Sequence, residues 1–241
     1  MSVSYIPYKD LETIFLDAGN TMVSMDYEWL NDELRRCGVS CGLQDLRRAE
    51  AAARPMVSAE MERFKSTENQ GTSLFYMRSI LKGLKSTSFM SDKALDHIIE
   101  DLYKILGAPG MMQRLWSNIL PGVREAIESL QRKGLKLVVV SNSDGTVEEI
   151  LTKVDLRRYF FRIVDSHLVG FEKPDPRLFH HALKLSNAEP ETTIHIGDLY
   201  HVDVIGARSA GLHAALLDPF GDWQDFDCPR FADLLDFANS F

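Results

Sequence analysis

Short apolar runs recur along the chain, separated by segments of mixed polarity. Within each run the apolar residues mostly follow one another instead of alternating with polar ones. This pattern is typical of parallel strands that are covered on both faces. It predicts five buried strands, at Thr13–Leu16, Lys136–Val140, Arg162–Val164, Thr193–Ile196 and His213–Leu217.

Segments with helical periodicity accompany these runs. One of them, "PGVREAIESLQRKG", has proline at its start and glycine at its end, as helices prefer. The others are "GTVEEILTKVDL", "DPRLFHHALKLS" and "DVIGARSAG". Strands that alternate with helices are joined by right-handed crossovers. The sequence therefore predicts an α/β fold with a doubly wound parallel sheet.

One connection is far longer than the others. From about residue 25 to residue 120 only helical periodicity occurs, and an ordinary loop is much shorter than this. We expect an inserted all-helical cap domain at 25–120, with 1–24 and 121–241 forming the α/β core. Because the insertion follows the first strand, we expect it to lie above the carboxyl ends of the strands and to act as a substrate lid.

Polar residues follow four of the predicted strands. Asp17 ends the first strand, Ser141 the second and Asp198 the fourth, while Lys173 follows the third after a loop. Singly, each fits an ordinary role, because an Asp often caps a helix and a Ser-Asn pair often forms a turn. In a parallel sheet, however, all four loops open on the same edge. Together with Asp203 they indicate one site.

The chemistry of this set is coherent. Asp17 is suited to nucleophilic attack, and Lys173 can neutralise charge that develops on a transferred group. Asp198 and Asp203 provide hard oxygen ligands without Cys or His, a combination that favours Mg²⁺. Ser141 and the backbone N–H groups that follow it, beginning with Asn142, can hold phosphoryl oxygens.

The chain resembles the haloacid dehalogenase (HAD) superfamily, in the branch with a helical cap after the first strand. The matching segments are "DAGNT" (17–21), "VSNS" (140–143), "EKPDP" (172–176) and "IGDLYHVD" (196–203). The resemblance implies a Rossmann-like core, Asp17 as a nucleophile that forms an aspartyl intermediate, Ser141 as a phosphoryl hydrogen-bond donor and Lys173 as the balancing cation. It also implies Mg²⁺ as cofactor, held by Asp17, the Gly19 carbonyl, Asp198 and Asp203, the last directly or through water.

Gly19 departs from the pattern of the family. Phosphatases of this family usually read Asp-x-Asp, and the second acid protonates the leaving group, a contribution of about 10²–10⁴ in rate. Gly19 has no side chain for this, and Asn20 could position a water but not act as a base. We therefore expect a Mg²⁺-dependent phosphatase for a small phosphorylated metabolite that works without this acid. A carbon–halogen hydrolase, a phosphonate-cleaving enzyme and a non-catalytic phosphate- or metal-binding module remain open as alternatives.

Composition narrows the partners. A formal net charge of −8 over 241 residues, with no long basic run, argues against a nucleic-acid-binding surface. No apolar stretch approaches the roughly 20 residues of a membrane span. The N-terminus lacks the basic start and apolar core of a signal peptide. We expect a cytoplasmic protein that binds a small molecule and neither nucleic acid nor membrane. The substrate, and the choice between monomer and homodimer, are left open.

Overall fold

The computed structural model describes residues 6–224 and 226–241. The N-terminal stretch that argues against a signal peptide begins with residues 1–5, which lie outside the described residues. The chain forms two compact units. The α/β unit comprises Ile119–Phe241 together with the chain up to Ser24, and the helical unit comprises Met25–Asn118.

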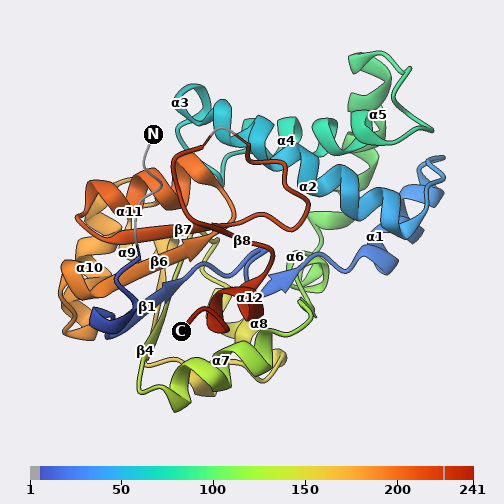
Figure 1. Cartoon of the computed structure of the whole chain (residues 1–241). Coiled ribbons are helices and arrows are strands. Elements are labelled where there is room, and N and C mark those ends of the chain that lie inside the picture. The colour runs from blue at the N-terminus through green and yellow to red at the C-terminus, as the bar shows by residue number, and fades with distance from the viewer. Residues whose placement is uncertain (1–5, 225) are drawn as a thin grey trace. The chain divides into compact units, whose positions relative to one another are not determined.

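A parallel sheet is the centre of the α/β unit, and its strands are seen side by side in Figure 1. Within the described residues it has six strands in the order β5-β4-β1-β6-β7-β8. Every neighbouring pair is parallel. The strands are β1 (Thr13–Leu16), β4 (Lys136–Ser141), β5 (Arg162–Asp165), β6 (Thr193–Gly197), β7 (His213–Leu217) and β8 (Arg230–Phe231). The predicted α/β class is therefore confirmed, and all five predicted strands are present.

Helices cover both faces of this sheet. Consecutive residues of a strand point to opposite faces, so a strand packs against both layers of helices. The α-helices of this unit are α7 (Val123–Arg132), α8 (Val147–Lys153), α9 (Ser166–Val169), α10 (Pro176–Ser186), α11 (Gly206–Ser209) and α12 (Leu234–Ala238). Ile14 and Leu16 of β1 pack with residues of α7, α8 and α12, whereas Phe15 packs on the other face with residues of α10 and α11. Burial on both faces explains why the strands are apolar without alternation.

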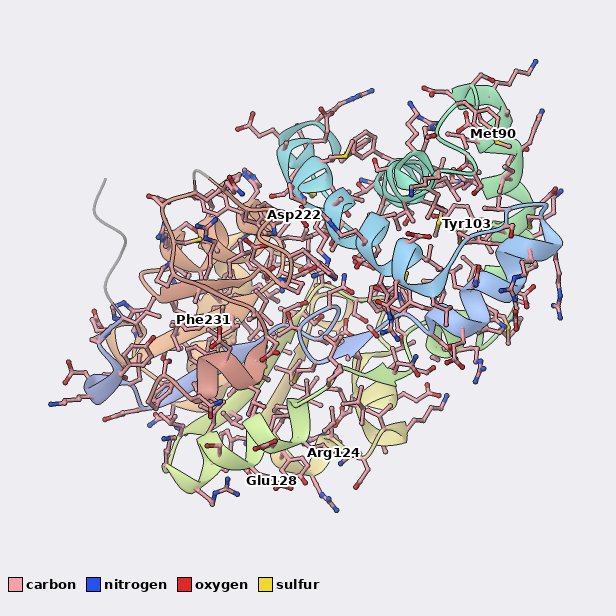
Figure 2. All side chains as sticks on the ribbon, turned by 45° about the vertical axis from the view of Figure 1, so that its right-hand side comes forward. Met90, Tyr103, Arg124, Glu128, Asp222 and Phe231 are labelled. Atoms are coloured by element: carbon pink, nitrogen blue, oxygen red, sulfur yellow. The ribbon has the colours of Figure 1, made fainter. Side chains whose placement is uncertain are left out.

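Helix α7 is joined to the chain segment between α8 and β5 by polar contacts at the surface. Arg124 donates to the Asp155 carbonyl at 3.0 Å, and the Tyr159 hydroxyl donates to Glu128 at 2.9 Å. Figure 2 shows Arg124 and Glu128 on α7. Shorter helical turns complete the unit: η1 (Tyr8–Asp10), η2 (Arg157–Tyr159), η3 (Pro190–Thr192) and the π-helical η4 (Tyr200–Ile205).

The helical unit packs around a core of its own. Its helices are α1 (Tyr27–Arg36), α2 (Leu43–Ala59), α3 (Met61–Phe64), α4 (Gln70–Gly83), α5 (Asp92–Leu106) and α6 (Met111–Leu115). Side chains of Asp26, Asn69 and Ser91 cap the first turns of α1, α4 and α5, where backbone N–H groups lack helical partners. Leu30, Leu46 and other apolar residues fill the interior.

A buried polar cluster lies inside the helical unit. The Glu50 carboxylate accepts two hydrogen bonds from the Arg54 guanidinium, at 2.8 and 2.6 Å. It also accepts from the hydroxyl of Tyr27 at 2.9 Å and from the hydroxyl of Tyr76. Four donated hydrogen bonds allow the charge of Glu50 to be buried.

The apolar pattern does not predict the shortest strands. β2 (Val23–Ser24) and β3 (Asn118–Ile119) form a separate two-stranded sheet. β3 lies in the stretch 25–120, where we expected no strand, and β2 lies just before it. A two-residue strand is too short to show a periodicity. No helix in the described part of the chain has the length and apolar character needed to cross a membrane.

Candidate active site

The candidate site lies at the carboxyl ends of β1, β4 and β6. Leu16 pairs with Val139 of β4 and Ile196 of β6, so the residues that follow these strands emerge together. The backbone N–H of Asp17 donates to the Ile196 carbonyl at 2.9 Å, which extends the ladder by one residue. This hydrogen bond fixes the position of the Asp17 backbone relative to β6.

One oxygen of Asp17 receives two donors. Oδ1 accepts from Ser141 Oγ at 3.0 Å and from Lys173 Nζ at 2.7 Å. No protein donor contacts Oδ2 within the described residues, and the Asp17 side chain keeps 11% of its surface exposed. The carboxylate is therefore held by one oxygen and open at the other.

Lys173 lies between two carboxylates. Its side chain is 1% exposed, and its Nζ is 2.7 Å from Oδ1 of both Asp17 and Asp203. Burial alone would lower the pKa of Lys173, but the two carboxylates outweigh it and raise the pKa. Burial raises the pKa of Asp17, Lys173 opposes this, and the charge of Asp203 adds to it. The lysine is therefore a permanent cation whose charge is shared by both acids.

The backbone of Lys173 is fixed from two sides. The Asn142 side chain accepts from the Lys173 N–H at 2.7 Å and donates to the Lys173 carbonyl at 2.9 Å. The Lys173–Pro174 peptide bond is cis. Gly206 permits the close approach of this loop, because a Cβ there would lie 2.9 Å from Pro174 Cα. These contacts set the point from which the lysine side chain extends.

Protein donors contact both oxygens of the Asp203 carboxylate. Oδ1 accepts from Lys173 Nζ and from His195 Nε2, at 2.7 and 2.9 Å, and Oδ2 accepts from the N–H groups of Asp198 and Leu199, at 3.1 and 2.9 Å. Gly197 makes this arrangement possible, because a Cβ there would lie 2.1 Å from Asp203 Cγ. Burial would raise the pKa of Asp203, but Lys173 and His195 outweigh it and hold the pKa below its usual range.

Asp198 is connected to the loop that follows β1. Asn20 has a left-handed backbone, with φ of 52°, and its N–H donates to the Val23 carbonyl at 2.6 Å. This turn directs Asn20 Nδ2 to Asp198 Oδ2, at 3.2 Å. Gly19 lies in the same turn. The loop after Asp17 thus positions the carboxylate of Asp198.

Comparison with known proteins identifies the family. The family profile described as haloacid dehalogenase-like hydrolase matches residues 11–211. The chain belongs to the haloacid dehalogenase-like hydrolases. This confirms the superfamily that the four motifs predict.

Relatives of this family member include a mammalian protein and an archaeal enzyme. Haloacid dehalogenase-like hydrolase domain-containing protein 3 from Bos taurus is 42% identical over 125 residues, which cover 52% of this chain and 48% of that protein. Glyceraldehyde 3-phosphate phosphatase from Methanothermobacter thermautotrophicus is 33% identical over 99 residues, or 41% of this chain and 44% of that enzyme. The chain spans about half the length of these curated relatives.

A solved structure of the HAD-hydrolase YfnB from Bacillus subtilis, bound to magnesium, has the same fold. The TM-score is 0.63 at 18% identity, and the alignment covers 95% of this chain and 98% of that one.

The structure brings most of the predicted site residues into direct contact. Asp17, Ser141, Lys173 and Asp203 form one hydrogen-bonded chain, and Asp198 joins it through its N–H. Asn142 was expected to bind phosphate, and its side-chain amide bonds the Lys173 backbone. The roles of these residues in the HAD chemistry stay predictions.

Two residues of the site have no place in the predicted set. Asn20 contacts Asp198, and His195 contacts Asp203. The sequence signal for Asn20 is the Gly19-Asn20 pair shortly after Asp17, which favours a turn. The signal for His195 is its place between two isoleucines in the buried strand "TIHI".

Proposed function

We propose that this HAD-like hydrolase is a Mg²⁺-dependent phosphatase that acts on a small phosphorylated metabolite through a phosphorylated Asp17. The observation that carries the proposal is the asymmetric environment of the Asp17 carboxylate. Ser141 and Lys173 hold Oδ1, and Oδ2 has no protein donor within the described chain. A carboxylate held in this way is oriented for attack on phosphorus.

The donor chemistry at this edge fits Mg²⁺. The proposed ligands are the carboxylates of Asp17 and Asp198 and the carbonyl of Gly19, all of which are hard oxygen donors. In residues 6–224 and 226–241 no three His, Cys, Asp or Glu side chains are grouped as metal ligands. The proposed site agrees with this, because only two of its ligands are carboxylate side chains and the third is a backbone carbonyl. We leave Asp203 out of the proposed direct Mg²⁺ ligands, because Lys173, His195 and two backbone N–H groups already contact its oxygens. When bound, Mg²⁺ would offset the repulsion between the Asp17 carboxylate and an anionic substrate.

The reaction proceeds in two displacements. The Asp17 carboxylate attacks phosphorus, the ester P–O bond breaks, and the alkoxide leaves and takes a proton from water. Water then attacks phosphorus and gives a proton to the hydroxide left by the first step, the bond between phosphorus and Asp17 breaks, and phosphate leaves as the Asp17 carboxylate is restored. Ser141 Oγ and Lys173 Nζ orient the carboxylate in the first step, and they are placed to stabilise charge on the phosphoryl oxygens in both.

Gly19 determines which substrates suit this site. Without a carboxyl at this position, the leaving group receives no proton from the residue that usually supplies it in this family. Phosphates with good leaving groups, such as acyl and aryl phosphates, depend least on such an acid. We therefore expect turnover to rise as the pKa of the released alcohol, phenol or carboxylic acid falls.

The proposal also gives the helical unit a function. Met25–Asn118 forms a compact unit with its own core, as expected of a cap that folds separately from the catalytic core. We propose that residues 25–120 serve as the lid that selects the substrate, and that the protein works in the cytoplasm. The archaeal relative named glyceraldehyde 3-phosphate phosphatase supports a small phosphorylated substrate.

The test is phosphate release from a panel of acyl, aryl and alkyl phosphates, with and without Mg²⁺. Turnover that requires Mg²⁺ and disappears in Asp17→Asn would support the proposal. Halide release without Mg²⁺ from a haloacid would replace it with a carbon–halogen hydrolase. Phosphate binding without turnover on any substrate would indicate a non-catalytic module.

A further inference from the structure

His195 lies inside the sheet, directly behind the candidate site. It is on β6, where it pairs with Phe15 of β1 and Ala214 of β7, and no part of its surface is exposed. The ring of Phe179 packs edge-on against the imidazole, with 5.0 Å between ring centroids and an interplanar angle of 78°. The imidazole is therefore held in one orientation by apolar neighbours.

Among the residues that the structure describes, the imidazole has a single polar contact. Its Nε2 lies 2.9 Å from Asp203 Oδ1, the same oxygen that accepts from Lys173 Nζ at 2.7 Å. Since a carboxylate oxygen only accepts, Nε2 carries the proton. His195 Nδ1 is buried and has no hydrogen-bond partner among the described residues.

This pattern is unfavourable for a residue that serves stability alone. A buried polar atom without a partner costs free energy, and an apolar side chain of similar size would avoid that cost. The imidazole instead donates a second hydrogen bond to the oxygen that holds Lys173. Together with the N–H groups of Asp198 and Leu199 on Oδ2, this hydrogen bond fixes the plane of the Asp203 carboxylate.

We propose that His195 is a positioning residue for the phosphoryl transfer assigned to this site. By orienting Asp203 Oδ1, it holds Lys173 Nζ against Asp17 Oδ1. The inference rests on the proposed function only for its kinetic consequence. Because the His195 side chain is fully buried, a substrate has no access to it, and we expect its loss to lower kcat and leave KM unaltered.

A matched pair of variants separates the hydrogen bond from the bulk of the side chain. His195→Gln keeps an N–H donor at a similar distance from the backbone, and His195→Met has a similar length without a donor. The control is His213→Met, because His213 is a strand histidine of β7 that bonds the Glu191 carbonyl at 3.0 Å, outside the site. Kinetics are measured well below the Tm of each variant.

The expected result for His195→Met is a kcat about 10–100-fold below wild type, the usual effect of losing a residue that orients a catalytic group. Tm stays close to wild type, because the lost hydrogen bond is offset by removal of an unpartnered ring nitrogen. KM also stays close to wild type, because His195 is buried away from the substrate. His195→Gln recovers most of the loss, and His213→Met keeps the wild-type kcat. A wild-type kcat in His195→Met would overturn the inference. So would a result in which His195→Gln and His195→Met lose kcat by the same factor and Tm by the same amount.

A crystal structure of His195→Met keeps the inference testable if the wild-type protein releases no phosphate. In that case the proposed function fails, and the geometry decides the inference separately. We expect Lys173 Nζ to move away from Asp17 Oδ1 in the variant. Retention of the 2.7 Å contacts of Lys173 with both Asp17 and Asp203 would overturn the inference.

Discussion

Replacing Lys173 by Met tests the charge arrangement of the site. The variant keeps the length of the side chain but removes the cation that lies 2.7 Å from both Asp17 and Asp203. Two buried carboxylates then lose the cation between them and keep only uncharged hydrogen-bond donors. Removing one partner of a buried ion pair costs about 3–5 kcal/mol. For a chain of this size, 1 kcal/mol corresponds to about 2–4 °C in Tm, so we expect Tm to fall by about 6–20 °C.

A second variant shows whether charge is the cause. Lys173→Met/Asp203→Asn removes one of the two carboxylates that have lost their cation, and the introduced amide oxygen can still accept from the N–H groups of Asp198 and Leu199. We expect its Tm to lie above that of Lys173→Met, while phosphate release stays absent in both. Calorimetry at neutral pH measures the shift. A wild-type Tm in Lys173→Met, or a double variant less stable than the single one, would show that the Lys173 charge does not stabilise the two carboxylates.

Three further changes test other parts of the account. Ser141→Ala should lower kcat by about 10²–10³ by removing a donor from the reacting carboxylate, with little change in Tm, and an unchanged kcat would exclude Ser141 from the chemistry. Burial would raise the pKa of Glu50, but the charge of Arg54 outweighs it and lowers the pKa. The ionised Glu50 therefore stabilises the fold above the unfolded pKa of about 4.3, and this stabilisation is lost as pH falls through the folded pKa. Calorimetry should therefore show Tm falling in acid, and falling less in Glu50→Gln; an identical acid limb in the variant would contradict this. Gly19→Asp should speed hydrolysis of alkyl phosphates more than that of aryl or acyl phosphates in parallel assays, and equal or absent acceleration would mean that proton transfer does not limit the rate.

The sheet could be predicted because its strands are buried on both faces. Continuous apolar runs such as Thr13–Leu16 give a strong signal, and the polar residue after each run marks the carboxyl end of the strand. The short strands β2, β3 and β8 could not be predicted in the same way. They have two residues each and owe their conformation to pairing rather than to a pattern.

The site could be predicted as a set of residues but not as a set of contacts. Loop order brings Asp17, Ser141 and Lys173 to one edge of the sheet, and the structure joins them by hydrogen bonds. The sequence does not show that the oxygens of Asp203 turn toward Lys173 and the backbone, because this depends on the close approach that Gly197 allows. It also does not show that the Asn142 amide bonds the Lys173 backbone, since Asn142 lies in a loop after β4, where no strand or helix periodicity fixes the direction of a side chain.

The most direct test of the central claim is to trap the covalent intermediate. Protein mixed with an acyl phosphate and Mg²⁺ is quenched in acid, digested and analysed by mass spectrometry, with Asp17→Asn as the control. We predict one phosphoryl group on the peptide that contains Asp17, and none in the variant. Release of phosphate by the wild-type protein without any label on Asp17, or the same label in the variant, would contradict the account.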